Sequence, residues 1–205
     1  MYRKLDILIT GVGGQGLLTL ASIIANAAVR KDYNALVAET HGLSQRGGTV
    51  EVHVRIGEVE APLIPPRNVD IIISTELIET VRHLYYADTN TIIFTSTYLI
   101  PPPLPGIDLP TKEELIEALR KNVDAKKLWI VNTEEMALKV GSIRVQNTVL
   151  LGVALGSGAF REIIDYSSVE EAIRASLRKM TEINVKALKT GYIYAKEALS
   201  RKNNR

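Results

Sequence analysis

The apolar positions of this chain fall into short uninterrupted runs that alternate with helical patterns. Such runs, when bounded by polar or turn residues, are typical of strands buried in a sheet. They lie at Leu5–Thr10, Ala35–Glu39, Asp70–Thr75, Thr91–Thr97 and Leu128–Asn132. Helical patterns follow most of them, and the helix over Thr111–Asn122 opens on a capping box, Thr111-x-x-Glu114. This order predicts an α/β protein whose sheet is mostly parallel.

In one segment, apolar and polar residues alternate instead of forming an apolar run. Thr49–Ile56 places apolar residues on one side and polar residues, among them His53, on the other. The pattern predicts a strand with one polar face. Gly57–Glu58 is a turn signal, so we expect Val59–Leu63 to return as the second strand of a β-hairpin.

The last third of the chain carries only helical patterns after its final strand. Thr133–Val140 predicts a short helix, and Gln146–Gly156, rich in small apolar residues, predicts a buried one. The pattern Ser168-x-x-Glu171 predicts the cap of a helical region that breaks near 182–184 and continues to about Leu199.

Length and composition fit this α/β interpretation. A chain of 205 residues suits one domain, so we expect a single Rossmann-like domain over 1–205, with sheet, flanking helices, one β-hairpin and a helical tail at 160–205. Cysteine is absent, which excludes disulfides, thiolate zinc sites and cysteine-ligated iron–sulfur clusters.

No apolar window is long enough to span a membrane and no leader pattern is present, so the expected location is cytoplasmic. The formal charge is only +2, although residues 186–205 hold six Lys/Arg against one Glu. Cations at the end of a helix complement its dipole, so we expect neither a nucleic-acid nor a membrane partner.

A glycine-rich loop follows the first strand and precedes the first helix. Gly11-x-Gly13-x-x-Gly16 has the dinucleotide-binding spacing, in which glycines allow a tight turn and the helix N-terminus offers N–H groups to an anion. Glu39 stands where a ribose-binding acid is expected. The candidate anion-binding corner consists of Gly11, Gly13, Gly14, Gln15 and Gly16.

Three hypotheses remain open for this corner. A stand-alone Rossmann protein that binds NAD(P) or FAD is one, but the chain has no room for a second domain to hold a substrate. The sequence GVGGQG is also more specific than the generic pattern. A phosphate site of another kind is the second hypothesis, and a corner that only packs the helix on the sheet is the third.

The second candidate region is the aperiodic loop Thr40–Gly48. Arg46 lies there between polar and small residues, and a guanidinium suits bidentate binding of a carboxylate or phosphate. A local ion pair with Glu39 or Glu51 is the alternative. The histidines fit no ligand spacing and no serine lies in a G-x-S-x-G pattern, so we predict no metal site and no catalytic residue.

Several of these motifs together resemble one family. They are ITGVGGQG at Ile9–Gly16, AETHGLSQRGGTVEVHVRIG at Ala38–Gly57, IPPPLPG from Ile100, N-x-x-x-L-G at Asn147–Gly152 and EINVKALKTGY at Glu182–Tyr192. The chain resembles the gamma-type subunit or domain of 2-oxoacid:ferredoxin oxidoreductases, and within it the branch of indolepyruvate ferredoxin oxidoreductase beta subunits. The resemblance covers the chain from about Leu5 to Leu199.

The resemblance implies an oxidoreductase complex in which a large catalytic subunit carries thiamine diphosphate, magnesium and iron–sulfur clusters. That complex oxidatively decarboxylates an arylpyruvate to an acyl-CoA, with coenzyme A as co-substrate and ferredoxin as acceptor. This chain would complete the assembly, hold no cofactor tightly and be inactive alone. Its glycine corner would take a phosphate, such as one of coenzyme A, or the partner surface.

The resemblance also implies that one loop faces the partner's active site or the subunit interface. Its residues are His41, Ser44, Gln45, Arg46 and Gly47. A homodimer of the isolated chain is a further expectation, with Val149–Gly158 and the pair Tyr192 and Tyr194 as candidate surfaces. Ordinary core packing is the alternative for each surface.

Overall fold

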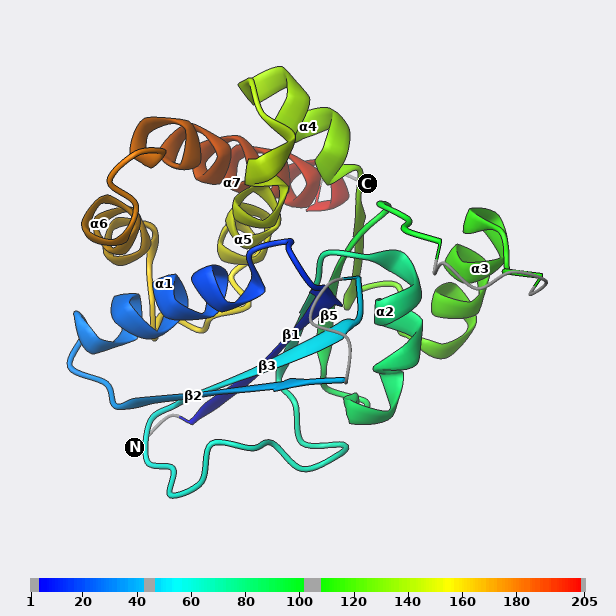
Figure 1. Cartoon of the computed structure of the whole chain (residues 1–205), viewed down its shortest axis with the longest axis horizontal. Helices are drawn as coiled ribbons and strands as arrows, with labels where there is room; N and C mark the ends of the chain where they lie inside the picture. The colour runs from blue at the N-terminus through cyan, green and yellow to red at the C-terminus, as the bar shows by residue number, and fades with distance from the viewer. Residues whose placement is uncertain (1–3, 43–46, 102–107, 204–205) are drawn as a thin grey trace.

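The computed structural model describes residues 4–42, 47–101 and 108–203. A single sheet has the strand order β2-β3-β1-β4-β5-β6 (Figure 1). The strands are β1 Leu5–Val12, β2 Ala35–His41, β3 Thr49–Ile56, β4 Ile71–Ser74, β5 Ile92–Ser96 and β6 Leu128–Val131. The strands β1, β4, β5 and β6 pair in parallel, and β3 is antiparallel to both β1 and β2. The predicted α/β class with a mostly parallel sheet is confirmed.

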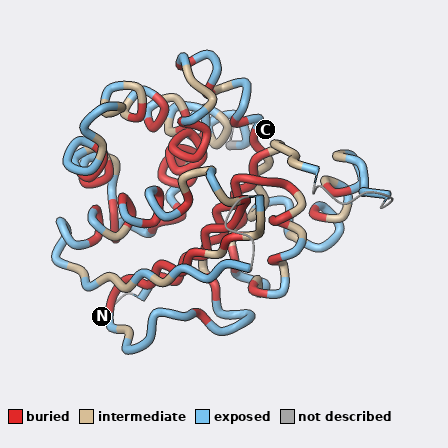
Figure 2. Tube along the Cα trace, in the orientation of Figure 1, coloured by how far each residue is buried: buried red, intermediate tan, exposed pale blue. Residues whose placement is uncertain are grey.

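Helices cover both faces of the sheet (Figure 1). One face carries α1 Leu17–Val29, α4 Thr133–Val140, α5 Gln146–Gly156, α6 Tyr166–Ser176 and α7 Thr181–Asn203. The other carries α2 Leu77–Arg82, the short 3-10 helix η1 Leu84–Tyr86 and α3 Lys112–Asn122, which opens on the predicted capping box. A second 3-10 turn, η2 Ile143–Val145, precedes α5. Buried residues concentrate in the sheet and in α5 (Figure 2).

The predicted hairpin forms with a different partner. Residues 59–63 form no strand, and β3 instead turns back from β2, with Val54 opposite Val37. The segment after β3 is held by side chains of β3. The guanidinium of Arg55 donates to the carbonyl oxygens of Ala61 and Leu63 at 2.7 and 3.2 Å. These bonds give two carbonyl groups of the segment a hydrogen-bond partner without a strand ladder. The expected strand at Val59–Leu63 was therefore wrong.

The predicted bounds of α4 and α5 are confirmed, but α6 begins earlier than its pattern indicated. Asp165 caps α6, because its carboxylate accepts from the backbone N–H of Ser168 at 2.8 Å and its own N–H donates to the Ser168 hydroxyl at 3.1 Å. The helical region breaks between Ser176 and Thr181 rather than near 182–184. Among the described helices, none is both long and apolar enough to cross a membrane.

Three glycines let α5 and α7 pack backbone against backbone. A Cβ atom built on Gly152 would lie 2.2 Å from the carbonyl oxygen of Leu188, and one on Gly191 would lie 2.0 Å from that of Val149. Gly156 is similarly close to α7. Every residue of α5 is buried. The small residues of this helix therefore serve core packing within the chain, and α5 is not a dimer surface.

Tyr192 and Tyr194 on α7 were expected either to form a dimer surface or to pack in the core, and the two residues differ. The ring of Tyr192 is half-buried and packs edge-on against Tyr166 at 5.1 Å between centroids. Tyr194 is 41% exposed.

We predict that Gly191→Ala lowers the free energy of unfolding by about 1–3 kcal/mol, because backbone atoms of α5 must move to admit the methyl group. Urea denaturation followed by circular dichroism measures this change. Gly42→Ala is the matched control: Gly42 is exposed and no described atom lies within 4 Å of its added Cβ. The control is expected to shift stability by less than about 0.5 kcal/mol. Equal midpoints for the two variants would contradict the prediction.

Candidate functional site

The glycine corner lies where β1 ends and α1 begins. Gly14 and Gly16 have φ values of 101° and 73°, left-handed conformations that only glycine adopts without strain. Gly16 is the N-cap of α1, where no side chain makes a capping hydrogen bond and the first turn has no acidic residue. The positive end of the helix dipole at this corner is therefore not neutralised by the residues that form the cap.

The side chain of Gln15 points into the corner rather than out of it. Its Oε1 accepts from the N–H of Val12 at 2.8 Å and from the hydroxyl of Thr75 at 2.7 Å, while its Nε2 donates to the Thr75 carbonyl at 3.3 Å. A Cβ on Gly11 would lie 2.1 Å from the same hydroxyl. Gln15 and Gly11 thus fasten the corner to the end of β4. Of the predicted corner residues, Gly14 is the exposed one.

Asn147 completes the corner, and sequence analysis assigned it no site role. Its Nδ2 donates to the carbonyl oxygens of Gln15 and Gly16 at 3.2 and 3.3 Å. The next residue, Thr148, donates its hydroxyl to Asn184 of α7 at 2.6 Å. The only sequence signal for Asn147 was its place in the N-x-x-x-L-G motif.

A hollow of about 920 Å³ opens beside the corner, between α1, α5 and the segment that joins α6 to α7. Its lining includes Gly14, Asn147 and three basic residues, Arg144, Arg178 and Lys179. These three residues are exposed, and the described lining contains no acidic residue. The hollow therefore combines a helix N-terminus with an excess of positive charge, which favours anions.

A smaller hollow of about 500 Å³ lies on the other side of the start of α1. Glu39, His41 and Leu18 line it together with glycines of the corner. The loop predicted to face a partner therefore begins next to the corner. It also ends there, because the N–H of Gly13 donates to the carbonyl of Gly48 at 2.9 Å. Gly47 precedes this contact, whereas Ser44, Gln45 and Arg46 lie outside the described residues.

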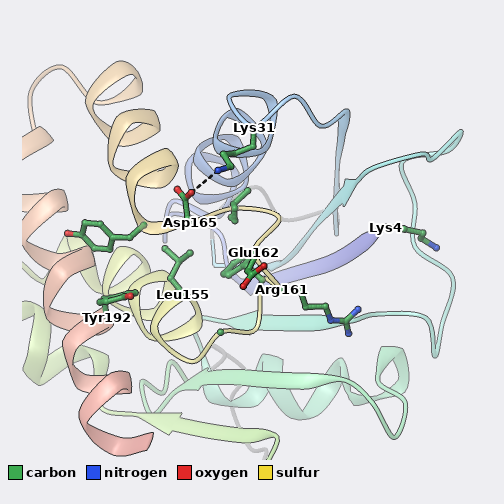
Figure 3. Close-up of a pocket in the computed structure, with 11 residues that line it drawn as sticks. Lys4, Lys31, Leu155, Arg161, Glu162, Asp165 and Tyr192 are labelled. Atoms are coloured by element: carbon green, nitrogen blue, oxygen red, sulfur yellow. Dashed lines mark hydrogen bonds and ion pairs between the residues drawn. The ribbon is translucent and has the colours of Figure 1, made fainter. Parts of the chain in front are cut away.

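A further hollow of about 1120 Å³ lies at the opposite end of the sheet (Figure 3). Figure 3 shows the ammonium of Lys31 directed at Asp165, 2.9 Å away, whereas Arg161 points elsewhere. Arg161 pairs with Asp70 at 3.0 Å. Because these cations already have carboxylate partners, we assign no ligand to this hollow.

The polar face of β3 is buried and forms a titratable cluster. Glu51 accepts from Nε2 of His83 at 2.9 Å and from the hydroxyl of Tyr86 at 3.2 Å. Nδ1 of His83 lies 2.6 Å from the carbonyl oxygen of Glu79, so both ring nitrogens face acceptors. His53 lies on this face as predicted, but it is buried, with 1% of its surface exposed. Among the described residues, no group of three or more acidic, histidine or cysteine side chains is placed to hold a metal ion.

The cluster perturbs the pKa values of its members in opposite directions. The ring of His53, whose Nε2 lies 3.6 Å from the Glu51 carboxylate, and then the hydrogen bond from His83 lower the pKa of Glu51 far below its usual value. Burial alone would lower the pKa of His83, but its hydrogen bond to Glu51 and its contact with the Glu79 carbonyl outweigh burial and raise the pKa. Glu51 and His83 therefore form an ion pair over a wider pH range than the free side chains would.

We predict that this pair gives stability two pH limits. Above about pH 6.5 the folded chain binds more protons at His83 than the unfolded chain does, so stability falls as pH rises through the raised pKa. Below about pH 4.5 the folded chain binds fewer protons at Glu51, so stability falls as pH drops. Urea midpoints measured from acid to alkaline pH, with an NMR titration of the His83 ring, check both limits.

Glu51→Gln should flatten both limbs of this profile and return the pKa of His83 toward its usual value. Glu58→Gln, at an exposed turn residue, is the control and should leave the profile unchanged. A His83 ring that titrates at the same pH in wild type and Glu51→Gln would show that the pair does not set these limits.

Comparison with known proteins places the chain in a family. The sequence profile of the family described as pyruvate ferredoxin/flavodoxin oxidoreductase matches residues 6–194. The indolepyruvate oxidoreductase subunit IorB of Archaeoglobus fulgidus is 43% identical over 193 residues, covering 92% of this chain and 94% of that protein.

Two solved structures share the fold. The gamma subunit of a keto/oxoacid ferredoxin oxidoreductase from Geobacter sulfurreducens is 20% identical, with a TM-score of 0.67, and the match covers 93% of this chain and 98% of that chain. A 2-oxoglutarate:ferredoxin oxidoreductase from Magnetococcus marinus, solved with 2-oxoglutarate, coenzyme A and succinyl-CoA, is 19% identical with a TM-score of 0.69, and the match covers 95% of this chain and 31% of that chain. From the profile match and the 43% identity over nearly its whole length, this chain belongs to the pyruvate ferredoxin/flavodoxin oxidoreductase family.

Proposed function

We propose that this chain is the small subunit of an indolepyruvate- or arylpyruvate:ferredoxin oxidoreductase, which converts the 2-oxoacid to an acyl-CoA. The observation that carries the proposal is the 43% identity, over nearly the full length of both chains, to an indolepyruvate oxidoreductase subunit. In this role the chain completes the assembly and the surroundings of the active site, and it is inactive alone.

The redox chemistry is assigned to a large partner subunit. The chain has no cysteine, so thiolate ligands for an iron–sulfur cluster must come from elsewhere. We assign thiamine diphosphate and magnesium to the same partner. In support, the Magnetococcus marinus chain is matched over only 31% of its length, so most of that protein lies outside the part that this chain resembles.

The corner and the basic hollow beside it are the proposed contribution of this chain to ligand binding. The N-terminus of α1 and the side chains of Arg144, Arg178 and Lys179 would bind a phosphate group of coenzyme A. The loop of His41, Ser44, Gln45, Arg46 and Gly47 begins and ends beside this corner. We propose that it faces the active site or the surface of the large subunit.

Assembly and turnover test the main proposal. Co-expressed with its large subunit, the chain should co-purify, and the complex should reduce ferredoxin only when indolepyruvate and coenzyme A are both present. Arg46→Ala should lower turnover of the complex while the variant subunit keeps the circular dichroism spectrum of wild type. The control is Arg120→Ala, exposed on α3 on the opposite face of the sheet. Unchanged turnover and assembly with Arg46→Ala would count against the proposed role of the loop.

The basic hollow has a separate test. Replacing Arg178 and Lys179 together by alanine should raise the KM for coenzyme A about fivefold or more, since about 1 kcal/mol of lost binding corresponds to roughly that factor. The KM for the 2-oxoacid should stay the same.

The alternative, a stand-alone NAD(P)- or FAD-binding protein, predicts tight binding of those cofactors to the isolated chain. Titration of the chain with NAD, NADP and FAD should show none.

A further inference from the structure

One surface helix lacks the charges that solvent-facing helices ordinarily carry. All 13 residues of α1, LLTLASIIANAAV, are uncharged. Leu18, Ser22, Ala25 and Val29 recur at spacings of four, three and four, which places them on one stripe of the helix. Leu18 and Val29 are 47% and 57% exposed. Ser22 between them is exposed and Ala25 is partly buried, so the stripe presents small and apolar side chains and no charge.

The strand beside this helix is the edge of the sheet. β2 ends the strand order, and no described strand pairs with its outer side. The carbonyl of Asn34 accepts from Gly57, and the N–H of Gly42 donates to Thr49, so the even-numbered residues of β2 bond to β3. The odd-numbered residues therefore direct their N–H and C=O groups outward. Residues 35–38, ALVA, include none of the lysines or prolines that commonly protect such an edge.

The edge and the helical stripe lie on the same side of the sheet. Val37 is opposite Val54 in the β2–β3 register, and Val54 belongs to the core cluster beneath α1. The side chain of Val37 thus projects toward the α1 side, where it is 37% exposed. Figure 1 shows α1 and β2 side by side. Together, the stripe of α1 and the outer edge of β2 form one largely apolar surface, which we call the α1–β2 edge, and the exposed Glu39 is the charged residue on it.

We propose that the α1–β2 edge binds a second copy of this chain, through antiparallel pairing of β2 with β2 about a twofold axis at Val37. The open strand edge is complementary to itself, as a twofold interface requires. Outward hydrogen-bonding groups lie on odd residues, so odd residues must pair with odd residues. Centring on Val37 sets Val37 opposite Val37 and Ala35 opposite Glu39.

Charge argues against a register centred on Glu39. Glu39 is the only acidic residue of β2, and a twofold axis at Glu39 would place two carboxylates directly opposite each other. With the axis at Val37, each Glu39 lies opposite an alanine and near residues 30–34 of the other copy, where Arg30 caps the end of α1. Because α1 and β2 run in opposite directions, the same axis brings Leu18 of one copy toward Val29 of the other.

The size of the surface sets the expected affinity. A helix of 13 residues is about 20 Å long, and a strand of 7 residues is about 23 Å long. The area that one helix and one strand of this length can bury is below the ~800 Å² per partner of a standard interface. We therefore expect a concentration-dependent dimer with a dissociation constant on the order of micromolar.

Sedimentation equilibrium of the isolated full chain tests the proposal. Wild type should pass from monomer to dimer as its concentration rises through the micromolar range. Val37→Lys and Val37→Glu should each stay monomeric, because like charges would then face each other across the axis. Mixing the two variants should restore a dimer, because the opposite charges meet at the same position. Both substitutions lie on an exposed edge, and circular dichroism checks that the variants fold.

The matched control is Leu138→Lys, at an exposed leucine on α4, and it should dimerise like wild type. A wild-type chain that remains monomeric throughout overturns the proposal. So does a Val37→Lys variant that dimerises normally, or a mixture of the two charged variants that fails to associate. The large subunit is absent from this experiment, so its outcome is independent of the proposed function.

Discussion

The close contact of α5 with α7 is the constraint on which the rest of the structure depends. Glycines at 152, 156 and 191 remove the side chains that would otherwise separate the two backbones. The resulting contact lets Thr148 reach Asn184, and it fixes the start of α5 against the corner. Asn147 then holds the carbonyls of Gln15 and Gly16. The shape of the candidate site thus follows from a packing contact between helices more than 130 residues along the chain from the corner.

The second face of the sheet is held by charge rather than by close packing alone. A strand whose polar side is buried must provide a partner for each polar group, because an unpaired buried charge is costly. Glu51 pairs with His83, and Arg55 pairs with Asp6 at 2.8 Å while also binding the segment after β3. This requirement explains why the carbonyls of Ala61 and Leu63 are bound to Arg55. It also makes stability depend on the ionisation of one histidine and one glutamate.

The two surfaces that we assign to binding differ in character and lie on either side of the start of α1. Toward α5, the corner meets exposed arginine and lysine side chains, which suits an anion. Toward β2, the surface carries the uncharged stripe of α1 and the carboxylate of Glu39, and it ends in an open strand edge, which suits a protein strand. The proposed separation allows ligand binding and self-association to be altered independently by substitution.

The sequence by itself determined the positions of the six strands that form, the bounds of α4 and α5, the cap at Thr111 and the family, although it also predicted a strand at Val59–Leu63 that does not form. These features depend on periodicity, capping and motifs, whose signals lie within a few neighbouring residues. Only the tertiary structure decided that β3 lies between β2 and β1, that His53 is buried, that Gln15 turns inward and that Asn147 reaches the corner. Each of these outcomes depends on a partner distant in the chain, 60 residues away for Gln15 and 132 for Asn147. Contacts at such separations have no local pattern, because they exist only once the sheet and its helices have assembled.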